Sequence, residues 1–277
     1  MYPRLFQTGP LLIPTYGAMA AVGLVCALLL AMRAARRMGM DPDAVWDLGL
    51  TAVLSAFIGS RVLMVATNWS DFLHFPLLML AAVPAGTGIP LYGGLVAGAV
   101  AVWLSARSKK MPLLRTLDAL APGLALGWGI LMLGCLAAGS CFGVPTDGPL
   151  GIVFHAKYAA LWYGTPLGVA LQPTQIYEAA AEFAICGVLL AMLHRRSLAA
   201  GKPLVKLQDG EVFGAWLFLG AAVHFVIEFY RGDAGRGSLF GGLMTVTQGL
   251  ALLVLIEGGA LWMDRGSKGK PAAYAFE

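Results

Sequence analysis

The chain has 277 residues, of which 58% are apolar and only 12% are charged, and its mean hydropathy is +0.75. A soluble domain carries about 25% charged residues, so this composition excludes an ordinary soluble domain and indicates a membrane protein with several spans. The formal net charge of +4 does not indicate a nucleic-acid partner, because the positive charges cluster beside apolar runs and are best explained by membrane topology.

Apolar runs of about the 20 residues needed to cross a bilayer follow one another along the chain. They predict an all-α membrane protein that forms one domain over residues 1–277, with seven transmembrane helices. The third run is short and is expected to begin within the preceding 77–90 stretch. The predicted spans are Leu12–Met32, Val45–Thr67, Leu91–Ala106, Leu117–Ala138, Pro173–His194, Val212–Tyr230 and Leu243–Met263.

Most of the 19 lysine and arginine residues fall in four segments, after the first, third, fifth and last runs. This alternation predicts that these segments are cytoplasmic, with the N-terminus outside and the C-terminus inside. Only residues 1–10 precede the first run, and three arginines follow it, so we expect an uncleaved helix and no secretory signal. The four segments contain Arg33, Arg36 and Arg37; Arg107, Lys109, Lys110 and Arg115; Arg195, Arg196, Lys202 and Lys206; and Arg265, Lys268 and Lys270.

The longest stretch expected to be non-helical covers residues 139–172, on the outer side. It mixes turn-forming glycine and proline with apolar segments such as Ile152–His155. We expect this external loop, or arm, to fold over the mouth of the helix bundle.

Ionisable groups inside spans are costly and are therefore candidate functional residues. Arg61, near the outer end of the second span, is either an anion-binding residue or a structural cation that pairs with a buried glutamate or reaches the headgroups. Glu178 and Glu182 share one face of the fifth span. They are either an acid and base pair or structural partners of Arg61 and Arg231, and the structural role is favoured for Glu182.

His224, Glu228 and Arg231 have the spacing i, i+4 and i+7, which predicts one helical stripe toward the outer mouth. Such a stripe could bind a phosphate and move a proton, with Glu228 orienting His224. The alternative is an ordinary ion pair between Glu228 and Arg231.

Small residues and cysteines mark two further places. Gly93 and Gly94 open the third span, where a bare backbone permits close approach of helices or lipid headgroups. Cys135 and Cys141 lie at the outer end of the fourth span, where a disulfide is conceivable. No histidine or second cysteine pair stands at zinc spacing, so no metal site is expected.

Three other positions are expected to be structural. Asp118 could pair with a loop cation such as Arg115, and Cys26 and Cys186 are expected to be buried, inert thiols.

These stretches, in this order, resemble the prolipoprotein diacylglyceryl transferase family, and the resemblance covers nearly the whole chain. The matching segments are residues 13–17 (IPTYG), 59–61 (GSR), 92–94 (YGG), 118–122 (DALAP), 134–143 (GCLAAGSCFG), 172–178 (QPTQIYE) and 227–231 (IEFYR).

The resemblance implies a seven-span enzyme of the bacterial inner membrane with its site toward the outer face and with no cofactor. Its partners would be phosphatidylglycerol, the lipobox region of a prolipoprotein signal peptide, and membrane lipids. The lipobox cysteine thiol would attack the diacylglyceryl carbon, forming a thioether and releasing glycerol phosphate. Catalytic roles fall on Tyr92, His224 and Glu228, and substrate-binding roles on Arg61, Arg231, Tyr16, Gly93, Gly94, Cys135, Gly143, Gln175, Tyr177 and Glu178.

This chain departs from the family pattern at three positions. Tyr92 replaces the usual histidine before the two glycines, and Met132 and His224 replace two arginines. Two always-charged anion donors are thereby lost. Two alternatives to the transferase therefore stay open: a relative without catalysis that binds lipid or lipopeptide in the same cavity, and a different chemistry on the same scaffold.

Overall fold

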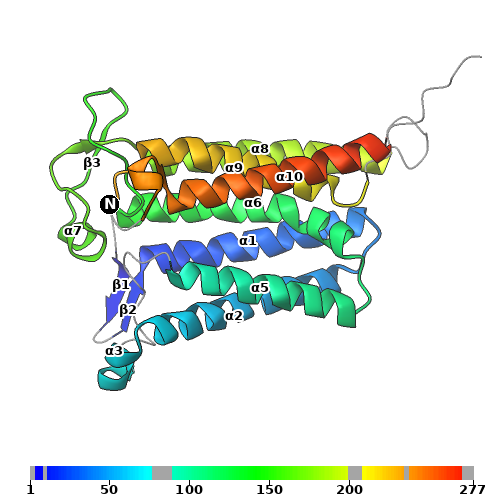
Figure 1. The fold of residues 1–277 in the computed structure, drawn as a ribbon, viewed down its shortest axis with the longest axis horizontal. Helices are drawn as coiled ribbons and strands as arrows, with labels where there is room; N and C mark the ends of the chain where they lie inside the picture. Colours follow the sequence, from blue (N-terminus) through cyan, green and yellow to red (C-terminus); the bar gives the residue numbers. More distant parts are fainter. Residues whose placement is uncertain (1–3, 9–10, 77–88, 199–207, 234–236, 270–277) are drawn as a thin grey trace, which may run out of the picture.

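The computed structural model describes residues 4–8, 11–76, 89–198, 208–233 and 237–269. Long helices run side by side along the longest axis of the molecule, and the small elements gather at one end of them (Figure 1). The long helices are α1 (Thr15–Arg37), α2 (Pro42–Thr67), α5 (Ile89–Ser108), α6 (Leu113–Ala138), α8 (Thr174–Leu198), α9 (Glu211–Ile227) and α10 (Val246–Gly269).

A helix is present at each of the expected places, so the prediction of a mostly helical membrane protein is confirmed. Within the described residues, six helices are long and apolar enough to cross a membrane, and α5 contributes the shorter apolar stretch Gly93–Ser108. The count of seven spans therefore remains a prediction.

The short elements were not predicted. Helices α3 (Trp69–His74) and α7 (Lys157–Tyr163) are only six and seven residues long. Three antiparallel strand pairs join β1 (Arg4–Thr8) to β2 (Leu11–Pro14), β3 (Ile152–Val153) to β4 (Ala170–Leu171), and β5 (Ser238–Leu239) to β6 (Met244–Thr245). The expectation that residues 139–172 are wholly non-helical was wrong, because α7 lies within them.

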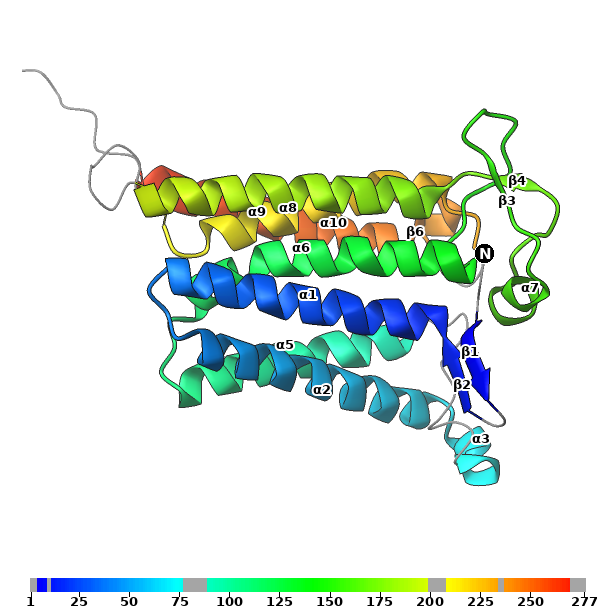
Figure 2. The ribbon, with the colours of Figure 1, turned by 180° about the vertical axis from the view of Figure 1, so that it is seen from behind.

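We call residues 139–172 the arm, and the end of the bundle that carries them the arm end. The N-terminal strand pair lies at this end too, and Figure 2 shows the same grouping from behind. The guanidinium of Arg4 lies 3.6 Å from the centre of the Tyr158 ring of α7. This cation–π contact joins the first strand to the arm.

The opposite end carries the basic segments and is called the basic end. Arg36 and Arg37 close α1, and Arg107 lies in the last turn of α5. Lys109 and Lys110 follow in the connection to α6. Positive charge is thus concentrated at the end of the bundle farthest from the arm.

Helices α1 and α6 form the centre of the bundle, with α2 and α5 on one side and α8, α9 and α10 on the other (Figures 1 and 2). Glycines permit the close α1–α6 contact: a Cβ on Gly23 would lie 2.9 Å from the Gly127 carbonyl oxygen. Small residues of this kind let membrane helices pack backbone to backbone.

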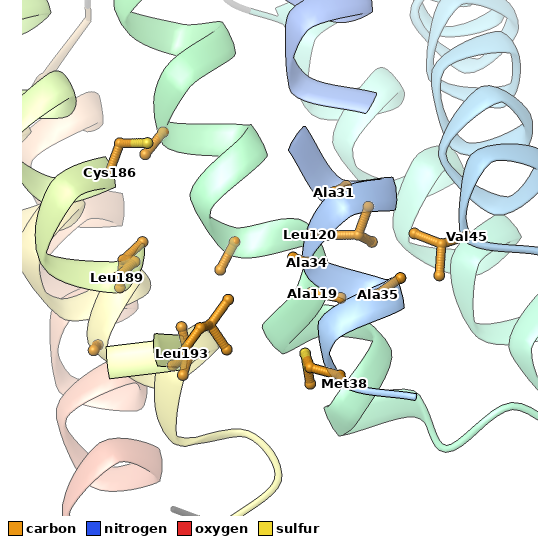
Figure 3. Close-up of a cluster of buried hydrophobic side chains, with 14 of the residues drawn as sticks. Ala31, Ala34, Ala35, Met38, Val45, Ala119, Leu120, Cys186, Leu189 and Leu193 are labelled. Atoms are coloured by element: carbon orange, nitrogen blue, oxygen red, sulfur yellow. The ribbon is translucent and has the colours of Figure 1, made fainter. Parts of the chain in front are cut away.

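The largest apolar core lies toward the basic end and is rich in alanine (Figure 3). Beside it, Asp118 of α6 is fully buried. Its two oxygens accept hydrogen bonds from the backbone N–H groups of Gly210 (2.8 Å) and Phe213 (2.9 Å) at the start of α9. Arg115, which we named as one example of a loop cation that could pair with Asp118, donates to the carbonyl of Met38 instead. A carboxylate at a helix N-terminus satisfies exposed N–H groups and suits the helix dipole.

Candidate active site

The site is framed by the join between α6, the arm and α8. Helix α6 ends at Gly139, whose φ of 84° is left-handed, and the N–H of Ser140 donates to the Cys135 carbonyl (2.9 Å). The first turn of α8 holds the next residues: Thr174 donates to the Cys141 carbonyl (2.7 Å) and Gln175 to the Ser140 carbonyl (2.6 Å). Gln175 is fully buried, so its amide fixes the frame of the site.

Gly143 joins the arm to the residues that follow α9. Its N–H donates to the Gln172 carbonyl (3.0 Å), and the N–H of Val144 donates to the Tyr230 carbonyl (2.9 Å). A Cβ at Gly143 would lie 2.5 Å from the Gln172 oxygen and 2.8 Å from the Tyr230 oxygen. Only glycine fits here without moving the backbone. Tyr177 supports the same region by donating to the Gln172 side chain (2.9 Å).

A buried carboxylate with two side-chain partners lies beneath this frame. Glu178 of α8 is only 2% exposed. Its Oε1 accepts a hydrogen bond from the indole N–H of Trp128 on α6 (2.8 Å) and lies 3.0 Å from Nδ1 of His224 on α9. Three helices therefore meet at one carboxylate oxygen. One alternative considered above aligned His224 with Glu228, and another paired Glu178 with an arginine; the observed contact joins His224 to Glu178.

Glu228 is buried and turns toward α10. Its Oε1 accepts a hydrogen bond from the hydroxyl of Thr245 (2.9 Å), which lies at the end of β6 just before α10. Helix α9 ends at Ile227, and residues Glu228–Tyr230 form the 3₁₀ turn η2. The helical stripe predicted through Arg231 was therefore wrong at its last position.

Arg231 follows this turn in an extended conformation. Its Nε and Nη2 donate to the two carboxylate oxygens of Asp233 at 2.8 and 2.6 Å. Burial disfavours the charge of Arg231, but the Asp233 contact and the neighbouring thiol and carboxylate groups outweigh it and raise the guanidinium pKa above its ordinary value. Arg231 is thus a permanent cation in a fork geometry suited to carboxylate or phosphate.

An apolar wall lies beside these polar groups. Met132, Cys135 and Ala179 form a small buried cluster, against which Tyr16 and Cys141 pack. Met132 is 4% exposed. The family resemblance led us to expect an arginine here, but this position contributes a thioether to a buried apolar cluster.

Several predicted site residues lie away from this cluster. Arg61 is on α2, where its guanidinium lies 5.0 Å from the centre of the Phe57 ring, and the central helices α1 and α6 separate α2 from α8 and α9 (Figure 1). Gly93 and Gly94 face α2: their Cβ atoms would lie 2.5 Å from the Gly59 oxygen and 2.9 Å from the Ala56 oxygen. The side chain of Tyr92 lies outside the described residues.

The sequence reasoning missed three residues of the cluster. Trp128 donates to Glu178, Thr245 donates to Glu228, and Asp233 pairs with Arg231. Asp233 gave a local signal, since it stands two residues after the arginine. Trp128 and Thr245 gave none, because their partners are distant in sequence. No group of three or more histidine, cysteine or acidic residues among the described residues could hold a metal ion.

The helices and this cluster define a multi-pass membrane protein that gathers buried glutamates, a partly buried histidine and a partly buried arginine at one end. Residues 3–263 match the family model described as prolipoprotein diacylglyceryl transferase. The chain belongs to the prolipoprotein diacylglyceryl transferase family.

The sequences of curated relatives align with this chain over most of their length. The chain is 31% identical over 258 residues to phosphatidylglycerol–prolipoprotein diacylglyceryl transferase 2 of Clostridium perfringens, which covers 93% of each protein. The transferase of Clostridium tetani is 28% identical over 93% of this chain and 95% of its own length. That of Synechococcus elongatus is 30% identical over 94% of this chain and 87% of its own length.

Proposed function

We propose that this protein transfers the diacylglyceryl group of phosphatidylglycerol to the lipobox cysteine of prolipoproteins. One observation carries the proposal: a chain that matches the family over residues 3–263 gathers a partly buried histidine on a buried carboxylate, and a forked cation, at one end. These are the groups that thiol alkylation with a phosphate leaving group requires.

The reaction needs a proton acceptor, because a thiol with an ordinary pKa near 8.5 is mostly protonated at neutral pH. His224 takes this proton on Nε2, while Glu178 accepts the Nδ1–H hydrogen bond and stabilises the imidazolium that forms. Trp128 fixes the Glu178 oxygen that holds the ring. Glu178 is therefore a positioning residue for His224.

The thiolate sulfur then attacks the diacylglyceryl carbon, a C–S bond forms, and the C–O bond to phosphate breaks. The phosphodiester carries one negative charge, and the departing glycerol phosphate carries two near neutral pH. Arg231 offers paired N–H donors to this growing charge. Before the substrate binds, the carboxylate of Asp233 accepts the hydrogen bonds of the guanidinium. The phosphate of the substrate then replaces this carboxylate as the acceptor.

The remaining candidates support this site in three ways. Gly143, Gln175 and Tyr177 hold the frame, while Tyr16 and Cys135 line the wall that faces the lipid. Glu228 anchors the start of α10 beside Arg231. We assign Arg61 to lipid headgroups on the surface of α2, and Gly93 and Gly94 to the α2–α5 contact, with Tyr92 a further candidate for proton transfer.

The arm end would face outward in a bacterial inner membrane. The basic segments lie at the opposite end, and cytoplasmic loops carry the excess of lysine and arginine. This orientation, together with α5 as a seventh span, places the site where an exported precursor arrives.

The test is complementation. Bacterial cells depleted of their own transferase would express this protein, and the lipoprotein mass would be measured. Diacylglyceryl-modified lipoprotein is expected with the parent sequence and only a trace with His224→Ala at equal membrane abundance. Absence of modified product with well-folded, correctly inserted parent protein would contradict the proposal.

The second candidate is a relative that binds lipid without transferring it. The dry apolar setting of Met132 favours it, since a thioether cannot bind phosphate. Phosphatidylglycerol retained by the purified protein in native mass spectrometry, with no modification in the same cells, would support this candidate.

A further inference from the structure

Two thiols lie in contact at the C-terminal end of α6, in a place where the backbone is held from both sides. The Sγ atoms of Cys135 and Cys141 lie 3.4 Å apart, and both residues are free cysteines. Cys135 is only 1% exposed, whereas Cys141 is partly exposed. Cys141 is thus the more exposed residue of the two, so we assign the first reaction with an outside reagent to its thiol and the second to Cys135.

The contact is built into the end of α6. Cys141 has a φ of 56°, a left-handed conformation that few residues other than glycine adopt. Such a conformation persists only where surrounding contacts fix it. Here Thr174 and Gln175 of α8 hold the carbonyls of Cys141 and Ser140, and the last turn of α6 holds the N–H of Ser140.

The electrostatic setting favours attack by the outer thiol. The hydrogen bond with Cys135 and the nearby charge of Arg231 lower the pKa of the Cys141 thiol, although burial opposes them. A larger thiolate fraction makes a cysteine a better nucleophile toward disulfides.

We propose that Cys135 and Cys141 form a reversible dithiol–disulfide pair that reacts with small oxidised thiols of the disulfide class. The Cys141 thiolate attacks one sulfur of the external disulfide RSSR, forming a mixed disulfide and releasing RS⁻, which takes up the proton of Cys135. The Cys135 sulfur then attacks Cys141 Sγ, releasing the second RS⁻, which takes the proton that Cys141 lost. Two protein thiols are oxidised and one RSSR is reduced to two RSH; excess RSH reverses both steps.

Closure changes the frame of the site. The sulfur atoms must approach from 3.4 Å to about 2.05 Å, which draws Cys141 toward α6. Its carbonyl is the acceptor for Thr174 at the start of α8, one turn before Glu178. Oxidation therefore displaces the turn that positions the Glu178–His224 pair, and it also stiffens the join between α6 and the arm.

The experiment counts thiols and does not depend on transferase activity. The variant Cys26→Ser/Cys186→Ser keeps only the proposed pair and would be purified in detergent in the reduced form. After incubation with oxidised glutathione, acid quenching and denaturation, we expect maleimide labelling to fall from two thiols to none, with a mass loss of about 2 Da for the two hydrogens removed. Dithiothreitol should restore both thiols.

Single variants in the same background test the order of attack. Adding Cys135→Ser should leave Cys141 carrying one glutathione as a stable mixed disulfide, whereas Cys141→Ser should leave Cys135 unmodified. Circular dichroism and gel filtration would establish that each variant is folded. Two alkylatable thiols remaining after oxidation, or glutathione on Cys135 instead of Cys141, would overturn the proposal.

Discussion

Two buried carboxylates at opposite ends of the bundle have different kinds of partner. Asp118, at the basic end, accepts hydrogen bonds from two backbone N–H groups of α9. Glu178, at the arm end, meets the side chains of Trp128 and His224. Backbone donors cannot take up or release a proton, whereas histidine can. Burial alone therefore does not mark a functional acid in a membrane bundle, whereas contact with a side chain that can exchange a proton does.

Replacing the titratable partner gives the largest expected effect at the arm end. His224→Ala should lower the rate of diacylglyceryl transfer by about 10²–10⁴-fold, because the thiol loses its proton acceptor. The rate would be measured with purified enzyme in phosphatidylglycerol-containing detergent micelles. Glu178→Gln should lower kcat by a smaller factor, because His224 stays in place. Near-normal rates with His224→Ala would mean that the arm end resembles the basic end in being purely structural.

Arg231 and Arg61 both lie toward the arm end but differ in their contacts. Arg231→Ala should weaken transition-state binding by about 2–5 kcal/mol, as when one member of a buried charge pair is truncated. Arg61→Ala should cost less than about 1 kcal/mol, because its described contacts, with Phe57 and Met64, lie within its own helix α2. Values of kcat/KM for both variants would be compared, and the reverse ranking would remove Arg231 from the site.

At the basic end the expected change is in stability. Asp118→Ala should lower the free energy of unfolding by about 2–4 kcal/mol, because it leaves the buried N–H groups of Gly210 and Phe213 without this acceptor. Thermal unfolding in detergent would measure it. Asp47→Ala is the matched control: Asp47 forms an exposed ion pair with Lys109 at 3.0 Å, worth less than about 1 kcal/mol. Equal unfolding temperatures for the two variants would mean that the buried Asp118 carboxylate stabilises the fold no more than the exposed Asp47 carboxylate does.

The arm itself gives the smallest effect. Gly143→Ala should cost about 1–3 kcal/mol through overpacking, because its Cβ would meet two backbone oxygens. Gly187→Ala is the control, since no heavy atom lies within 4 Å of its added Cβ. Limited proteolysis should cut the arm faster in the first variant only. Equal cleavage would show that the arm is not fastened through Gly143.

The sequence could predict the helices because an apolar run of sufficient length has few alternatives in a bilayer. It also placed Glu178, His224, Glu228 and Arg231 near one end, since position along a span fixes depth. It could not give the direction in which each side chain points across the bundle. Arg61 has a similar depth but lies on another side, and this depends on how α2 packs against α5.

The sequence also could not predict which side chains pair between different helices. His224 and Glu178 are 46 residues apart, whereas the i, i+4 spacing offered Glu228 as the obvious neighbour. Two of the short strand pairs, β3–β4 and β5–β6, were missed for a related reason. Ladders of two residues, such as Ile152–Val153 with Ala170–Leu171, are fixed by the loops around them and carry little pattern of their own.

The position of Asp118 also has a consequence for how the protein is made. The ribosome delivers α6 before α9, and Asp118 is 92 residues upstream of Gly210. The acceptor for the first turn of α9 is therefore synthesised before α9 itself. Helices α9 and α10 pack against each other, so they can dock as a pair against α6. A nascent chain stopped after α8 would hold the Asp118 carboxylate without these two donors, so insertion of the final helix pair completes the assembly of the basic end.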